Sequence, residues 1–166
     1  KILRGCKKNS KKYMKKLISY FIFFIIFTTN SFSDVIKPSK KIEPDQVVKI
    51  QLKGLMNNND PYSDVGIEQT WEFAHPKNKK YTGPLEKFKK MLKGDSYYML
   101  LGHKQHQIEQ VYLNENVATF LVTILDSDKN YYKFKWQVEK YINQGPLKDC
   151  WLTTAVSQPV SLGSSI

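Results

Sequence analysis

The sequence has little cysteine and no long hydrophobic segment. Of its 166 residues two are cysteines, and Cys6 lies in an N-terminal stretch with the character of a leader, so Cys150 stands alone in the remainder. An internal disulfide framework is therefore excluded, and the apolar surroundings beside Trp151 predict that Cys150 is a buried structural thiol. The longest mainly apolar run, 17–27, has eleven residues, whereas a membrane-spanning helix needs about 20.

Acidic residues are missing from positions 1–33, which hold eight Lys or Arg residues. Residues 1–13 precede the first methionine, and we interpret them as a non-native upstream extension. Residues 14–33 combine a charged start, the apolar run and a small-x-small end at 31–33, which is the pattern of a secretory signal peptide. We expect cleavage before Asp34 and export to the periplasm or the exterior of a bacterium, with an uncleaved membrane anchor as the alternative.

The formal net charge of +11 belongs mostly to this leader. Without residues 1–33 the chain has 18 basic and 15 acidic residues, which is a net charge of +3. Such a balance lacks the electrostatic footprint of a nucleic-acid-binding protein, so we expect no nucleic-acid partner. The remaining 133 residues are enough for one compact domain with its own core.

The spacing of apolar residues predicts helices first and strands afterwards. We expect an α+β fold in which three helices pack on one face of a curved antiparallel sheet of about four strands. Polar residues mark a mobile lead-in, a loop between the second and third helices, and a loose tail. The predicted segments are a lead-in at 34–43, helices at 44–57, 64–75 and 84–93, a loop at 76–83, strand-like runs at 97–101, 107–113, 117–125, 131–139 and 150–156, and a tail at 158–166.

Several short motifs along this order of elements resemble one family. They are Asp45-Gln46-Val47-Val48 with Gln51, Leu52 and Leu55; Asn59-Asp60; Phe73-Ala74-His75-Pro76 with Asn78; Thr82-Gly83-Pro84 with Phe88 and Met91; and Cys150-Trp151-Leu152-Thr153. Together they span 44–157 and resemble domain of unknown function 4864, a family of secreted bacterial proteins with plant relatives. The resemblance implies a nuclear transport factor two-like, or cystatin-like, fold, in which helices close a cone over a curved sheet. His75 departs from the small residue expected before Pro76.

The resemblance also implies a pocket inside the cone. Relatives on this fold, including isomerases, dehydratases and polyketide cyclases, place an Asp, His or Tyr in such a pocket, so His75, Tyr81 and His103 are the candidate catalytic residues. As general bases the histidines need an orienting carboxylate; the alternative is that they are surface or loop histidines. On the strand at 131–139 the inward positions carry aromatic and aliphatic residues while the charges face outward, which argues against an acid–base pair there.

Aromatic side chains dominate the positions that face the predicted pocket. Trp71, Phe88, Tyr97 and Trp136 are therefore the candidate contacts for a small apolar or aromatic ligand. We expect no cofactor and no metal site, because the spacing of His103 and His106 is not that of a zinc site. The Asp-Ser-Asp sequence at 126–128 lacks the glycine and final glutamate of a calcium loop, and we interpret it as a hairpin turn.

Positive charge is concentrated between positions 77 and 93. Seven lysines against Glu86 give this stretch a charge of +6, while the rest of the chain after residue 33 carries −3. Such a patch could dock an anionic membrane surface or an acidic partner, although a solvated helix face is the simpler interpretation. The candidate patch residues are Lys77, Lys79, Lys80, Lys87 and Lys90.

Three functions therefore remain. The favoured one is an exported binding module that holds a small ligand in the cone or a protein partner on its sheet. The second is an enzyme of the isomerase, dehydratase or cyclase type that uses the pocket. The third is a structural or assembly protein, for example a homodimer through the outer face of the sheet. No motif in the sequence names a reaction.

Overall fold

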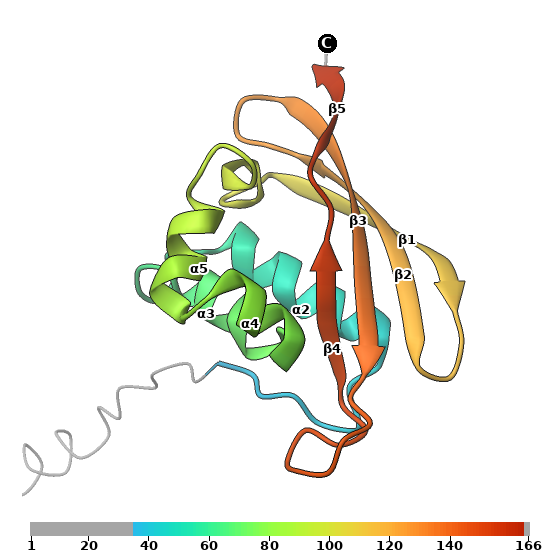
Figure 1. Cartoon of the computed structure of the whole chain (residues 1–166). Coiled ribbons are helices and arrows are strands. Elements are labelled where there is room, and N and C mark those ends of the chain that lie inside the picture. The colour runs from blue at the N-terminus through green and yellow to red at the C-terminus, as the bar shows by residue number, and fades with distance from the viewer. Residues whose placement is uncertain (1–34, 165–166) are drawn as a thin grey trace, which may run out of the picture. The chain divides into compact units, whose positions relative to one another are not determined.

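The structure is a computed structural model that describes residues 35–164, so the predicted leader and its cleavage site lie outside the described residues. Within that range the chain has an α+β fold in which four α-helices precede an open antiparallel sheet of five strands (Figure 1). None of the described helices has the length and apolar character needed to cross a membrane. The elements are α2 Pro44–Met56, α3 Val65–Glu72, α4 Pro76–Thr82, α5 Leu85–Leu92, a 3-10 turn η1 Tyr98–Leu100, β1 Gln105–Leu113, β2 Val117–Leu125, β3 Asn130–Lys140, β4 Trp151–Val156 and β5 Val160–Ser164.

Helix α2 is the main helix on the sheet. It begins with a capping box, in which the Glu43 backbone N–H donates to Oε1 of Gln46 at 2.9 Å, and Pro44 occupies the first turn. Its apolar stripe is completely buried against β3 and β4. This stripe consists of Val47, Val48, Leu52 and Leu55. The helical spacing predicts three of these, Val48, Leu52 and Leu55, together with Met56, which is only half-buried.

Helix α3 crosses α2 at two glycines. A Cβ atom placed on Gly66 would lie 2.0 Å from the carbonyl oxygen of Gly54, so the two backbones approach too closely for any side chain. The hydroxyl of Thr70 then donates to the Gly66 carbonyl at 2.8 Å. The close approach places α3 beside α2, on the same face of the sheet.

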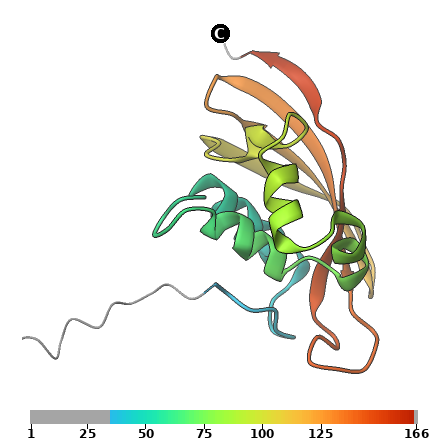
Figure 2. The same cartoon turned by 60° about the vertical axis from the view of Figure 1, so that its left-hand side comes forward.

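The sheet has the order β1-β2-β3-β4, and β5 continues along the free part of β3 beyond β4. In both views the helices lie together on one face of it (Figures 1 and 2). Register places Phe120 opposite Trp136 and Val122 opposite Phe134, and these inward side chains are buried under the helices. The alternation predicted for 131–139 and the interior position predicted for 117–125 are confirmed.

The predicted loop at 76–83 is wrong, because most of it forms α4. Pro76 starts this helix, and the ring of His75 accepts a hydrogen bond from the Lys77 backbone N–H at 3.0 Å. Gly83, with φ of +83°, ends it. None of the residues of α4 is buried, so the segment carries no apolar periodicity from which a helix could have been recognised.

Three further segments differ from the sequence-based expectations. The run 97–101 contains a 3-10 turn instead of a strand. The predicted tail forms β5, which pairs with 130–133 of β3. The predicted mobile lead-in is anchored to α3, because the amide of Gln69 exchanges two hydrogen bonds with the backbone of Ile36, at 2.7 and 2.9 Å.

Candidate functional site

A cavity of about 100 Å³ lies between the helices and the inner face of the sheet. Residues from all four α-helices, from the η1 region and from β3 and β4 line it, and none of them carries a charge at neutral pH. Half-buried side chains, among them Met91, Tyr97 and Val156, form part of its wall. The full lining is Gln51, Leu55, Thr70, Ala74, Asn78, Thr82, Phe88, Met91, Leu92, Tyr97, Leu100, Trp136, Thr153 and Val156.

A buried hydrogen-bond network forms the polar part of this wall. Oε1 of Gln51 accepts from the hydroxyl of Thr153 at 2.7 Å and from the indole N–H of Trp136 at 3.0 Å. Nε2 of Gln51 donates to the carbonyl of Thr70 at 3.0 Å. Because both oxygen contacts come from donors, the orientation of the amide is fixed. The network ties α2 to α3, β3 and β4 around the cavity.

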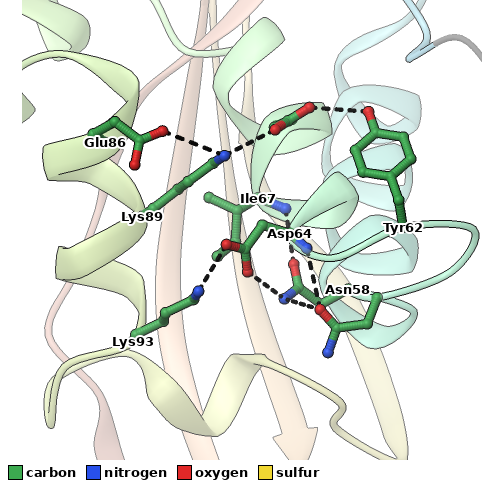
Figure 3. Close-up of polar contacts among 9 residues, drawn as sticks. Asn58, Tyr62, Asp64, Ile67, Glu86, Lys89 and Lys93 are labelled. Carbon is green, nitrogen blue, oxygen red and sulfur yellow. Dashed lines mark hydrogen bonds and ion pairs between the residues drawn. The ribbon is translucent and has the colours of Figure 1, made fainter.

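Helix α5 covers the cavity with Phe88, Met91 and Leu92. Its main neighbours are α3 and α4, and ion pairs fasten it to the first of these (Figure 3). Lys89 lies 2.9 Å from a carboxylate oxygen of Glu68, and Lys93 lies 2.7 Å from one of Asp64. We call these two pairs the α3–α5 clamp.

The carboxylates of the clamp are supported from the loop between α2 and α3. Asn58 donates to Asp64, and Tyr62 donates to the second oxygen of Glu68 at 2.9 Å (Figure 3). The hydrogen bond from Lys93 holds the pKa of Asp64 below its usual range, and the one from Lys89 does the same for the pKa of Glu68. Both carboxyl groups are therefore charged at neutral pH.

Three of the four predicted ligand contacts, Phe88, Tyr97 and Trp136, line the cavity. Trp71 does not. Its ring packs against that of Phe88, with 5.0 Å between centroids, and Nζ of Lys79, which belongs to α4, lies 5.2 Å from the centre of the Trp71 ring. Trp71 thus packs against the covering helix α5 through Phe88 without lining the cavity.

None of the predicted catalytic candidates lines the cavity. His75 is buried, contrary to the expectation of a surface or loop histidine, and its ring packs against Tyr141. Burial lowers the pKa of His75, partly opposed by Glu139. Because Nδ1 accepts from the Lys77 backbone, the neutral ring carries its proton on Nε2. This ring therefore offers no free lone pair for a general base.

His103 is also buried, at the η1 end of the sheet. Its Nδ1 lies 2.7 Å from the Leu100 carbonyl, which can only accept, and its Nε2 lies 2.8 Å from Nδ1 of His106. In the neutral pair His106 must then be the donor, so the free lone pair is on Nε2 of His106. Burial lowers the pKa of both rings. Tyr81 is 85% exposed on α4.

The lysines of 77–93 are not one uniform patch. Lys89 and Lys93 belong to the clamp, and Lys79 is half-buried against Trp71, where burial lowers the pKa of its amine. The other four are exposed: Lys77, Lys80, Lys87 and Lys90.

Two smaller predictions can be placed directly. Cys150 is buried, as predicted, and burial raises the pKa of its thiol. Asp126 begins the β2–β3 hairpin turn and accepts from the backbone N–H groups of Asp128 and Asn130, as expected of a turn residue. Among residues 35–164 no group of three His, Cys, Asp or Glu residues is arranged to hold a metal.

Comparisons with protein-family models, with curated proteins and with solved structures found no match for this chain. The resemblance described above therefore stays a prediction.

The sequence-based reasoning missed the polar residues of the site. Gln51 had a visible signal, because it lies on the buried stripe of α2 between Val48 and Leu55, where a polar residue needs a partner. No sequence signal marked Thr70 and Thr153 as site residues, since threonine is common at both helix and strand positions. Their contacts with Gln51 depend on tertiary packing.

Proposed function

We propose that this protein is a binding module that holds a small uncharged ligand between its helices and its sheet, in a cone of the nuclear transport factor two-like kind. The observation that carries the proposal is the lining of the cavity, which combines aromatic and aliphatic side chains with a few satisfied polar groups and includes no charged residue. Ligand sites usually have this composition. The lining includes no Asp, Glu, His, Lys or Arg residue, and the hydroxyl of its tyrosine, Tyr97, already donates to the Val156 carbonyl, which makes an enzyme of the isomerase or dehydratase type the less favoured function.

The size of the cavity limits the ligand. An engineered apolar cavity of about 150 Å³ holds one benzene molecule, so a volume of about 100 Å³ sets a single small ring or a short chain as the upper limit of ligand size. For a ligand of about seven non-hydrogen atoms, typical efficiencies give a binding free energy on the order of −5 kcal/mol, or a Kd on the order of 0.2 mM. Binding is therefore expected to be weak and fast.

The test is a titration of the purified domain with phenol and fluorobenzene up to several Kd, followed through the methyl resonances of Leu55 and Met91. Both residues line the cavity, so we expect saturable shifts for at least one probe. Met91→Trp should fill the cavity and abolish the shifts at Leu55. Lys90→Trp is the matched control, because Lys90 is the exposed neighbour of Met91 and lies outside the lining.

If neither probe shifts these resonances in the wild-type protein, the proposal is wrong. It is also wrong if Met91→Trp binds as tightly as the wild type, because the shifts would then come from another site. Should Met91→Trp fail to fold, Val156→Phe fills the same cavity from β4.

We also propose, on the signal-peptide pattern, that this binding takes place outside the cytoplasm. Among the candidate partners, an anionic membrane surface would meet the four exposed lysines Lys77, Lys80, Lys87 and Lys90. Neutralising these four and measuring sedimentation with anionic vesicles at low and high salt tests that contact separately from the cavity.

A further inference from the structure

The cavity wall also constrains the chemistry of the ligand. We infer that the ligand is a neutral molecule that donates a hydrogen bond, such as a phenol or a small alcohol. This inference rests on the proposed function and specifies the class of molecule that the same site takes.

The hydroxyl groups of the lining have already used their protons. Each hydroxyl carries a single hydrogen, and each of the four donates it to an acceptor within the protein. Two of the oxygens already accept one hydrogen bond, that of Thr153 from the indole N–H of Trp136 at 3.4 Å and that of Tyr97 from the amide of Gln158 at 3.5 Å, but each of the four keeps a lone pair that can accept. The four bonds are Thr153 to Oε1 of Gln51 at 2.7 Å, Thr70 to the Gly66 carbonyl at 2.8 Å, Thr82 to the Asn78 carbonyl at 3.0 Å, and Tyr97 to the Val156 carbonyl at 3.3 Å.

The nitrogen donors are committed in the same way. The indole N–H of Trp136 donates to Gln51, and the amide of Asn78 donates one hydrogen to the Thr153 carbonyl at 3.3 Å. What remains is the second amide hydrogen of Gln51 and of Asn78, against four hydroxyl oxygens that can only accept. The lining therefore offers more acceptors than donors, which favours a ligand that supplies a hydrogen.

The same lining also disfavours a charged ligand. An ionised carboxylate or ammonium entering the cavity would lose its water without meeting an opposite charge, which is strongly unfavourable. Lys89 on the covering helix and Lys93 directly after it are paired with Glu68 and Asp64 and do not line the cavity. A neutral hydrogen-bond donor can pair with the oxygens of the lining and leaves no unpaired charge inside the cavity.

Phenol, fluorobenzene and benzoate test this inference, because they share one ring and differ in the group attached to it. Fluorobenzene has nearly the size of phenol and no hydrogen-bond donor, whereas benzoate is charged. Kd values for all three come from the titration of the wild-type domain at pH 7. We expect phenol to bind at least as tightly as fluorobenzene, although phenol is the better hydrated of the two in water, and benzoate to bind at least tenfold more weakly than phenol.

Fluorobenzene binding tighter than phenol, or benzoate binding as tightly as phenol, would overturn the inference and leave the binding function standing. Failure of all three to bind would remove the binding function itself. Thr153→Val, Thr82→Val, Thr70→Val and Tyr97→Phe then locate the acceptor: at least one of these nearly isosteric changes should lower the affinity for phenol, relative to the affinity for fluorobenzene, about tenfold. If every variant that folds keeps the wild-type ratio of the two affinities, the hydroxyl acceptors play no part and the inference is wrong. Because four sites are tested, the result does not depend on whether the buried Thr153→Val variant folds.

Discussion

Helices α2 and α5 lie over the same face of the sheet, but they are held there by different forces. Four apolar side chains of α2 have no exposed surface at all and pack on β3 and β4. Helix α5 buries only Phe88 and Leu92, and it is fastened to α3 by the clamp pairs of Lys89 and Lys93. Burial of apolar surface involves no titrating group and no charge that salt can screen, whereas an ion pair depends on pH and is screened by salt. The covering helix is thus the adjustable side of the cavity.

This difference between α2 and α5 affects how a ligand enters the cavity. Helix α5 supplies three residues of the cavity wall, Phe88, Met91 and Leu92, so any displacement of this helix would open or close the cavity. At its start Gly83 has φ of +83°, and a Cβ atom there would lie 2.6 Å from Cδ of Lys87. The connection between α4 and α5 therefore depends on glycine. Loosening the clamp should admit ligands faster without unfolding the core under α2.

The largest expected effect comes from truncating a leucine under each helix. Leu52→Ala removes a fully buried side chain of α2 and should lower the free energy of unfolding by about 3 to 5 kcal/mol. Leu92→Ala, on α5, should cost about 2 to 3 kcal/mol, because its site adjoins the cavity and α5 can settle into the space. Urea unfolding followed by circular dichroism measures both. Equal losses would mean that α5 is as rigidly packed as α2.

The sequence was sufficient to predict those elements whose buried residues recur with a simple period. The stripe of α2 and the inward set of β3 were predicted because each buries one face with regular spacing. Helix α4 was missed because it buries no residue, and β5 because all five of its residues are exposed. Both segments are held by backbone hydrogen bonds, which leave no apolar pattern in the sequence.

The site was predictable only in its aromatic part. Phe88, Tyr97 and Trp136 were selected because aromatic side chains at inward positions line pockets as well as cores. His75 and His103 were left as either pocket bases or surface or loop histidines, because no sequence pattern shows whether a residue at a helix end or in a loop is buried. The clamp was read as part of a basic patch, since the acids that neutralise Lys89 and Lys93 lie more than 20 residues earlier in the chain.

A smaller effect should follow from removing one clamp charge. Lys89→Gln should lower the free energy of unfolding by about 0.5 to 1 kcal/mol, because its pair with Glu68 is partly shielded from solvent. The matched control is Lys49→Gln, which breaks the exposed pair with Asp45 on α2 and should cost less than about 0.5 kcal/mol.

The same two variants test whether the clamp controls the rate at which a ligand enters and leaves the cavity. If α5 is the adjustable side, Lys89→Gln should raise both the association and dissociation rates of phenol, measured by relaxation-dispersion NMR, and Lys49→Gln should change neither. Identical kinetics in the two variants would show that the clamp does not control access to the cavity.

The smallest effect concerns the pH dependence of the clamp. The pKa of Glu68 is lowered in the folded protein by its hydrogen bond from Lys89, so the folded state binds its proton less readily than the unfolded state does. The stabilisation from this group is complete above the ordinary carboxyl pKa of 4.5 and is lost as the pH falls through the lowered pKa of the folded state.

Glu68→Gln removes the charge at every pH. The difference in unfolding free energy between wild type and Glu68→Gln should therefore be about 0.5 to 1 kcal/mol at pH 6 and should shrink as the pH falls from 4.5 through the lowered pKa of the folded state. A difference that does not shrink below pH 4.5 would mean that Glu68 stabilises α5 through packing or through Tyr62, and that the charges of the clamp do not distinguish α5 from α2.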